Sequence, residues 1–396
     1  MSRPLNLAEL VYTTKAPLAL LVKTSVLELS LDKIRSVLMK VQRQHPMLQM
    51  CVRDKSFQCH DRLIPIECHK VTRSCLRSFT RTLVNSGIDI SSYLLKVHYF
   101  SQPNCPLHLL FVSDHVAADG RSLYAILNSF VSEFDNHSDI ITANSPFVNF
   151  FDTLSIPSNY SDYIMILPDT LSVDFVLKGD PLVEDVSLFI EPKEFSVLKN
   201  LSKNRILSLS SVLLTLLSVS YSKLLQKRGI PRPHNIVSSV AVDLRSFCDP
   251  ILPSTLVSSI VASGSVGVTI ADDDVDSLFQ STGSAVSKML LNKEMLRIFH
   301  LFSTNPAEIL NLFNVSFVYS NIGHYKFATQ CSDFSVESLN FIISGPGLSK
   351  LPSVHIVEVN DTLSVTFTYS PKFFSRQTFV DWIELFNSLV TSIGQE

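Results

Sequence analysis

Apolar runs of strand length alternate with amphipathic helical segments along both halves of the chain. The run Leu18–Leu29 is rich in Val, Leu and Thr, which is typical of a strand, and apolar residues then recur at helical spacing from Leu31 to Val41. The same alternation returns after residue 183 and continues to a final helix that Ser375 is placed to cap. This order predicts an α/β fold, with mixed sheets flanked by helices.

The length of 396 residues exceeds what one ordinary hydrophobic core serves, so we expect two lobes of similar size. Little sustained periodicity is found from about residue 135 to residue 181, where Ser, Asn, Asp and Pro are frequent. We therefore expect an N-terminal lobe over residues 1–165, a linker over residues 166–182 and a C-terminal lobe over residues 183–396.

The composition excludes several classes of function. Hydrophobic residues make up 46% of the chain and charged residues 17%, which supports a sizeable core and argues against disorder. The net charge of −3 and the lack of a basic cluster give no sign of a nucleic-acid partner. Glycine occurs only 11 times, and neither dinucleotide-binding nor P-loop glycine motifs are present, so we expect no phosphate-cradling loop.

Cysteine usage and hydropathy bear on the compartment. Seven irregularly spaced cysteines and an N-terminus without an apolar signal core indicate a reduced, cytoplasmic chain. The uncharged run Ile206–Ser222 is at the short limit for a membrane span and is rich in hydroxyl groups. We expect a buried core helix there rather than a transmembrane segment.

The stretch "LHLLFVSDHVAADGRSLYAILNSF" (Leu107–Phe130) contains the most informative pattern. An apolar strand ends at His115, Asp119-Gly120 follows, and a helical stripe begins after Gly120. A base must be held rigidly and still reach a cleft, and the end of a strand meets both needs. For His115 taken alone, a structural loop histidine is the more common explanation, and a plain helix cap is an equal alternative for Asp119.

Two Cys-His pairs raise the question of a metal. Cys59-His60 and Cys68-His69 lie nine residues apart in "CHDRLIPIECHK". Zinc ligands are commonly separated by two to four residues within each pair, and adjacent Cys-His is awkward for one ion. We expect no metal site.

Five segments, in order along the chain, resemble the CoA-dependent acyltransferase superfamily. "SDHVAADG" is similar to its H-H-x-x-x-D-G signature, and "VAVDLRSFCDPILP" to its strand with Asp-x-Arg. "VSFVYSNIG" resembles the Asn-x-Gly strand of the alcohol acetyltransferase and polyketide-associated branches. "RQHPMLQM" and "YSPKFFSRQTF" match an early helix end and the last strand and helix. The resemblance implies two chloramphenicol-acetyltransferase-like lobes with an active-site tunnel between them.

The resemblance also implies an activity. Such enzymes transfer an acyl group from acyl-CoA to a hydroxyl or amine of a small molecule, without a covalent acyl-enzyme. Acetyl-CoA is the default co-substrate, no cofactor is bound permanently, and a monomer is expected. The acceptor is a small molecule, such as a specialised metabolite.

The resemblance assigns roles to individual residues. His115 is the general base, while Asp119 forms an ion pair with Arg245 beside Asp243. Gly120 permits a tight turn into the helix. Ser320 and Asn321 are candidates for stabilising the oxyanion, and the alternative is that they only end a strand. The alternative for Arg245 is a surface residue, which its strand context disfavours.

Two departures from the family pattern matter. Asp114 stands where the signature has its first histidine, and a carboxylate beside His115 would favour imidazolium and weaken a base. The Asp-Phe-Gly-Trp-Gly motif of plant BAHD enzymes is absent, so the resemblance to that branch is partial. Two alternatives stay open: a condensation-type enzyme that uses carrier-protein thioesters, and a catalytically silent binding relative.

Overall fold

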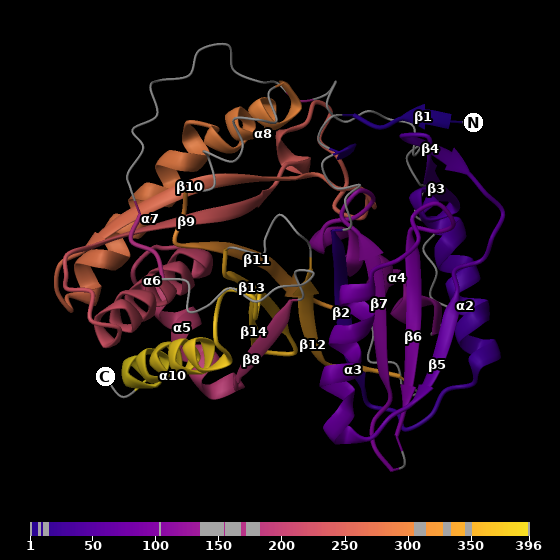
Figure 1. Ribbon diagram of the computed structural model, residues 1–396, viewed down its shortest axis with the longest axis horizontal. Helices are drawn as coiled ribbons and strands as arrows, with labels where there is room; N and C mark the ends of the chain where they lie inside the picture. Colours follow the sequence, from indigo (N-terminus) through magenta and orange to yellow (C-terminus); the bar gives the residue numbers. More distant parts are fainter. Residues whose placement is uncertain are drawn as a thin grey trace. The chain divides into compact units, whose positions relative to one another are not determined.

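The chain forms two compact units, which we call unit 1 and unit 2 (Figure 1). The computed structural model describes residues 2–6, 9–10, 16–102, 104–134, 154, 168–171, 183–304, 314–327, 334–344 and 351–394. Unit 1 comprises Met1–Ser155, Asp243–Val261 and Ile322–Pro346. Unit 2 comprises Ile156–Val242, Ala262–Asn321 and Gly347–Glu396.

The units are therefore discontinuous, which corrects the expected division into residues 1–165 and 183–396. Two segments of the C-terminal half, Asp243–Val261 and Ile322–Pro346, pack with the N-terminal part. The reason is long-range strand pairing and ion pairing, described below, which sequence distance does not indicate. Most of the expected linker, residues 166–182, lies outside the described residues.

Unit 1 contains a mixed five-stranded sheet among its described residues, in the order β12-β2-β7-β6-β5. Strands β12, β2, β7 and β6 pair antiparallel in turn, and β5 pairs parallel to β6. A smaller sheet has the order β1-β4-β3. The elements are β1 (Ser2–Pro4), β2 (Pro17–Thr24), α2 (Leu31–Gln44), η1 (Pro46–Gln49), β3 (Met50–Arg53), β4 (Ser56–Cys59), β5 (Ile66–Lys70), α3 (Arg73–Ser86), β6 (Leu95–Ser101), β7 (His108–Asp114), α4 (Gly120–Phe134), η3 (Arg245–Phe247) and β12 (Val336–Ile343).

The central strands of this sheet explain the apolar runs of the sequence. β2 and β7 lie between other strands, and nearly every residue of both is buried, as expected for strands covered on both faces. Their register pairs Pro17 with Asp114, so β2 is aligned with the strand end that precedes His115. Helix α3 packs Leu76, Phe79 and Leu83 over one face of the sheet.

Unit 2 contains a six-stranded sheet among its described residues, in the order β10-β9-β11-β13-β14-β8. β9 and β11 are parallel, whereas β13, β14 and β8 pair antiparallel. Asp243 in β9, Val261 in β10 and Ile322–Tyr325 in β11 belong to unit 1. The elements are β8 (Glu184–Ile190), α5 (Pro192–Asn204), α6 (Leu209–Lys227), β9 (His234–Asp243), β10 (Val261–Ile270), α7 (Val275–Leu291), α8 (Glu294–Thr304), β11 (Phe317–Tyr325), β13 (Ser353–Val359), β14 (Thr362–Tyr369) and α10 (Arg376–Ile393).

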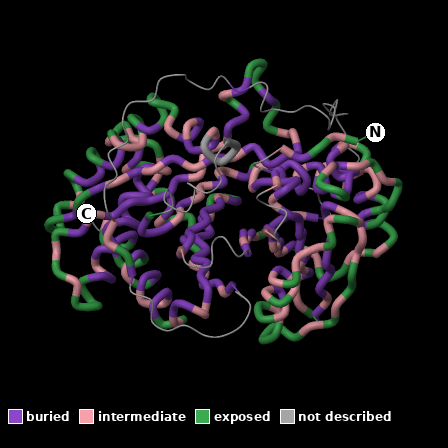
Figure 2. The backbone as a smooth tube through the Cα atoms, turned by 45° about the horizontal axis from the view of Figure 1, so that its top comes forward, coloured by how far each residue is buried: buried purple, intermediate pink, exposed green. Residues whose placement is uncertain are grey.

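Helix α6 covers most of the uncharged run that raised the question of a membrane span. By length and composition it is apolar enough to cross a membrane, but most of it is buried inside unit 2, and this is weak evidence for a span. Figure 2 shows the buried parts of the backbone in the interior and the exposed parts mainly on the outside. Its hydroxyl groups bond to carbonyls one turn back, for example Ser218 Oγ to Leu214 O at 2.8 Å. Trp382 Nε1 of α10 donates to Ser220 Oγ at 2.9 Å. The run thus forms the core helix that was expected.

Candidate active site

The candidate site lies in unit 1, where β7 ends and α4 begins. β7 ends at Asp114, and residues 115–119 form a turn that leads into α4 at Gly120. The backbone N–H of His115 donates to Ala16 O at 2.9 Å, which ties the histidine to the start of β2. The histidine is therefore held by the central pair of strands, as a rigid base requires.

The imidazole of His115 has a partner that the sequence did not indicate. Its Nδ1 lies 3.1 Å from Ser259 Oγ, although the two residues are 144 positions apart in the chain. Burial lowers the pKa of His115 below its ordinary value of 6.5, while the charge of Asp119 and a bond to its own backbone act in the opposite direction. The lowered pKa keeps the imidazole neutral at pH 7, which is the form that accepts a proton.

Asp119 and Arg245 form a buried ion pair. Arg245 Nη1 lies 2.9 Å from Asp119 Oδ2, and Arg245 Nη2 lies 3.2 Å from Asp119 Oδ1. Both side chains are almost inaccessible to solvent. Although burial opposes ionisation, the adjacent Arg245 and the backbone donors hold the pKa of Asp119 below its ordinary value. Arg245 is therefore no surface residue.

Asp119 is also the cap of α4, so both readings from the sequence apply. Its Oδ1 accepts from the backbone N–H and the hydroxyl of Ser122, at 2.8 Å and 2.9 Å. Its Oδ2 accepts from the backbone N–H of Ile260 at 3.0 Å. One carboxylate thus joins the helix start to the segment that carries Ser259.

Arg245 also holds the segment that carries Ser259. Its Nη2 donates to the carbonyl groups of Leu256 and Ser258 at 2.9 Å and 3.0 Å. Asp243 Oδ1 accepts from Arg245 Nη1 at 2.8 Å. Arg245 follows β9 in the short turn η3 rather than lying within a strand, and it belongs to unit 1. The ion pair therefore positions Ser259 next to the imidazole.

Gly120 stands at the expected turn into α4, has no positive φ, and packs closely against Ile322. A Cβ at this position would lie 3.0 Å from Ile322 Cγ2 and 3.1 Å from Ile322 Cγ1. The φ angle that only glycine adopts readily is found instead at Gly323, at +98°. Tyr325 Oη donates to Gly120 O at 3.2 Å, so this end of β11 packs on the start of α4.

Asp114 is buried and bonds to backbone groups. Its Oδ1 accepts from Val116 N at 3.0 Å and its Oδ2 from Ala16 N at 3.3 Å. Burial raises the pKa of Asp114 to about 6, because these two bonds only partly replace the lost water. Both carboxylate oxygens of Asp114 accept from backbone groups at the end of β7 and the start of β2. The pKa of His115 is shifted by burial, by the charge of Asp119 and by a backbone hydrogen bond.

Ser320 and Asn321 lie in β11, on the unit 2 side of the division. Both are partly exposed, and a hydrogen bond joins the side chain of Asn321 to Tyr319. Their assignment as oxyanion donors stays a prediction.

Comparison with known proteins gives the fold and leaves the sequence without a matching family. No family model and no curated protein matches the chain. Among solved structures, polyketide synthase associated protein 5 from Mycobacterium tuberculosis matches with a TM-score of 0.69 and 15% identity, over 99% of this chain and 98% of that chain. Trichothecene 15-O-acetyltransferase from Fusarium sporotrichioides matches with a TM-score of 0.73 and 11% identity, over 99% and 95%.

A peptide-synthetase domain has the same fold. The epimerization domain from the third module of tyrocidine synthetase B matches with a TM-score of 0.70 and 12% identity, over 100% of this chain and 97% of that chain. At these identities the likeness establishes the fold and no shared activity. The chain therefore has the two-lobed α/β fold of these proteins, which is the fold that was expected from the sequence.

Proposed function

We propose that this protein is a CoA-dependent acyltransferase that moves an acyl group, acetyl by default, to a hydroxyl or amine of a small molecule. The observation that carries the proposal is the position of His115. It follows the central strand β7, its Nδ1 lies 3.1 Å from Ser259 Oγ, and the buried pair of Asp119 and Arg245 holds that serine in place. The likeness to a trichothecene acetyltransferase supports an acyl-transfer fold.

The proposed chemistry uses His115 as a base. With Nδ1 donating to Ser259, Nε2 takes the proton from the acceptor hydroxyl as its oxygen attacks the thioester carbonyl. The carbon–sulfur bond of the tetrahedral intermediate then breaks, and the imidazolium returns the proton to the departing CoA thiolate. Ser320 and Asn321 are proposed to donate to the oxyanion. No covalent acyl-enzyme forms, and acyl-CoA is a co-substrate rather than a bound cofactor.

A condensation-type reaction is the second candidate, because peptide-synthetase domains match this fold over the whole chain. It differs from the first only in the donor, which would be an acyl group on a carrier protein. A catalytically silent relative is the third.

A donor panel separates these candidates. Acetyl-CoA, longer acyl-CoAs and an acyl-loaded carrier protein are each incubated with the enzyme and a pool of alcohols and amines, and products are detected by mass spectrometry. We expect transfer from acyl-CoA, and His115→Ala to lower kcat/KM by about 10²–10⁴-fold. His108→Ala, at the other end of the same strand, is the matched control and should leave kcat/KM unchanged.

Each other outcome has a defined meaning. Transfer from the carrier protein alone would establish the condensation-type reaction. No transfer from any donor by the folded protein would favour the silent relative. Full activity in His115→Ala would refute the base.

A further inference from the structure

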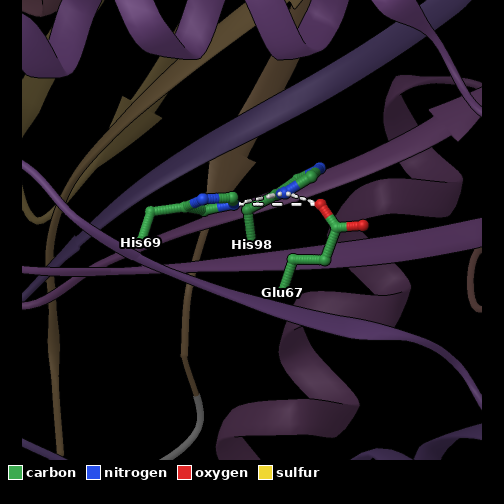
Figure 3. A group of neighbouring side chains, drawn as sticks. All are labelled: Glu67, His69 and His98. Carbon is green, nitrogen blue, oxygen red and sulfur yellow. Dashed lines mark hydrogen bonds and ion pairs between the residues drawn. The ribbon is translucent and has the colours of Figure 1, made fainter.

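A second group of chemically active side chains lies in unit 1, on the face of β5 and β6 (Figure 3). The parallel register pairs Glu67 with His98 and His69 with Phe100. Alternate residues of a strand share a face, so Glu67 and His69 of β5 project on the same side as His98 of β6. Figure 3 shows the two imidazoles and the carboxylate next to one another, with dashed lines joining them.

The spacing of the three converging atoms fits one metal ion. His69 Nε2 and His98 Nδ1 are 3.0 Å apart, His98 Nδ1 and Glu67 Oε2 are 3.4 Å apart, and His69 Nε2 and Glu67 Oε2 are 3.9 Å apart. A point equidistant from the three atoms lies about 2.0 Å from each, which is the length of zinc–nitrogen and zinc–oxygen bonds. The spacing of the three atoms thus lets one ion contact all of them.

The surroundings suit a site that an ion can enter. Glu67 is 46% exposed, while His98 is 3% exposed, so the group is open on one side and fixed on the other. His69 packs edge-on against Phe79 of α3, with ring centroids 4.9 Å apart, which holds its orientation. Lys96 Nζ lies 2.5 Å from Glu67 Oε1, the oxygen that does not face the histidines, and leaves Oε2 for the ion.

We propose that Glu67, His69 and His98 bind a divalent transition-metal ion, Zn²⁺ in the first instance, with water completing its coordination. Two histidines and one carboxylate are a ligand set that Zn²⁺ accepts in proteins. The ion would join the edge strand β5 to β6 and is separate from the proposed acyl-transfer chemistry. The competing arrangement is a hydrogen-bonded His69–His98 pair with Glu67 neutralised by Lys96, without an ion.

Zinc binding to the full-length protein tests the proposal. After treatment with a chelator, the protein is titrated with Zn²⁺ by calorimetry, and with Co²⁺ while visible absorption is recorded. We expect one tight site, Co²⁺ d–d bands, and a higher melting temperature with Zn²⁺, because an ion that binds only the folded state stabilises it. His69→Ala should weaken the tight site by at least about tenfold and abolish the bands.

Two further variants keep the test decisive. Cys68→Ser changes the residue between the two β5 ligands, whose side chain points to the opposite face, and should bind Zn²⁺ as the native protein does. Glu67→Gln keeps the size of the side chain, removes its charge, and should also weaken binding if His69→Ala fails to fold. Equal Zn²⁺ affinity in all folded variants, or no tight site in the native protein, would overturn the proposal.

Discussion

Two charged clusters of unit 1 differ in how completely the protein satisfies them. In the closed cluster, Asp119 and Arg245 are buried, and both carboxylate oxygens accept from Arg245 and from backbone N–H groups. In the open cluster, Glu67, His69 and His98 converge at an exposed edge. Burial lowers the pKa of His98 to about 4, so its ring is neutral.

The difference indicates different roles. A carboxylate whose acceptors are all occupied by protein donors has no capacity left for a ligand, so the closed cluster serves to position the segment with Ser259. In the open cluster, nitrogens of two imidazoles and one carboxylate oxygen lie within 4.8 Å of one another, so this cluster is suited to an ion. Burial of a charged group therefore does not by itself tell a positioning cluster from an ion-binding one. The number of hydrogen-bond donors and acceptors in the cluster does.

The largest effect is expected when the cation of each cluster is removed, which is Arg245 in the closed cluster and Lys96 beside the open one. Arg245→Ala leaves Asp119 buried without its partner and should lower the free energy of unfolding by about 3–5 kcal/mol. Denaturant unfolding followed by circular dichroism measures the loss. Fluorescence of Trp382, the only tryptophan, reports on unit 2 and serves as an internal reference.

Lys96→Ala is the matched control, because its ion pair with Glu67 is partly exposed and should be worth less than about 1 kcal/mol. Equal losses in Arg245→Ala and Lys96→Ala would contradict the distinction between the clusters.

Asp114 sharpens the comparison, since it is as buried as Asp119 but bonds to backbone groups instead of a cation. Its folded-state pKa of about 6 lies above the ordinary value of 3.8, so the folded protein binds more protons there and loses stability as the pH rises through this range. Between pH 5 and pH 8 the loss should be about 1 kcal/mol. Asp114→Asn should remove that difference in urea unfolding.

Asp119→Asn provides the contrast. The pKa of Asp119 is lowered from 3.8, so its contribution is present above pH 3.8 and is lost only as the pH falls through the lower folded-state value. This variant should be destabilised equally at pH 5 and pH 8. An unchanged pH dependence in Asp114→Asn would show that Asp114 is ionised in the folded protein.

Much of the architecture follows from local patterns. The helix expected from the apolar spacing between Leu31 and Val41 is α2, which ends at Gln44, before His45-Pro46. Ser375 does cap α10 by accepting from Thr378 N. The strand ending beside His115 and the helix after Gly120 are also as predicted, because buried runs and amphipathic stripes reflect burial directly.

Long-range pairing is what the sequence did not reveal. Strands β13 and β14 form a hairpin, with Asn360 and Asp361 at positive φ between them. β12 joins the sheet of unit 1 from the last quarter of the chain. Both features depend on partners that hydrophobic periodicity does not identify.

The two sites also depend on contacts between residues that are far apart in the sequence. His115 and Asp119 were readable from one short motif, but Ser259 meets His115 only through the fold. The adjacent Cys-His pairs do not form the cluster, because its three side chains alternate along β5 and continue on β6. The pattern Glu67-x-His69, with His98 in the strand "LKVHYF", was the available signal.

The central claim is that His115 acts as a neutral base in acyl transfer, and the pH dependence of kcat/KM tests it most directly. Because the pKa of His115 is lowered, the acidic limb should be centred below 6.5, with activity rising as the imidazole loses its proton. His115→Ala should lose about 10²–10⁴-fold in kcat/KM together with that limb. A limb that persists in His115→Ala, or one centred above 6.5, would contradict the account.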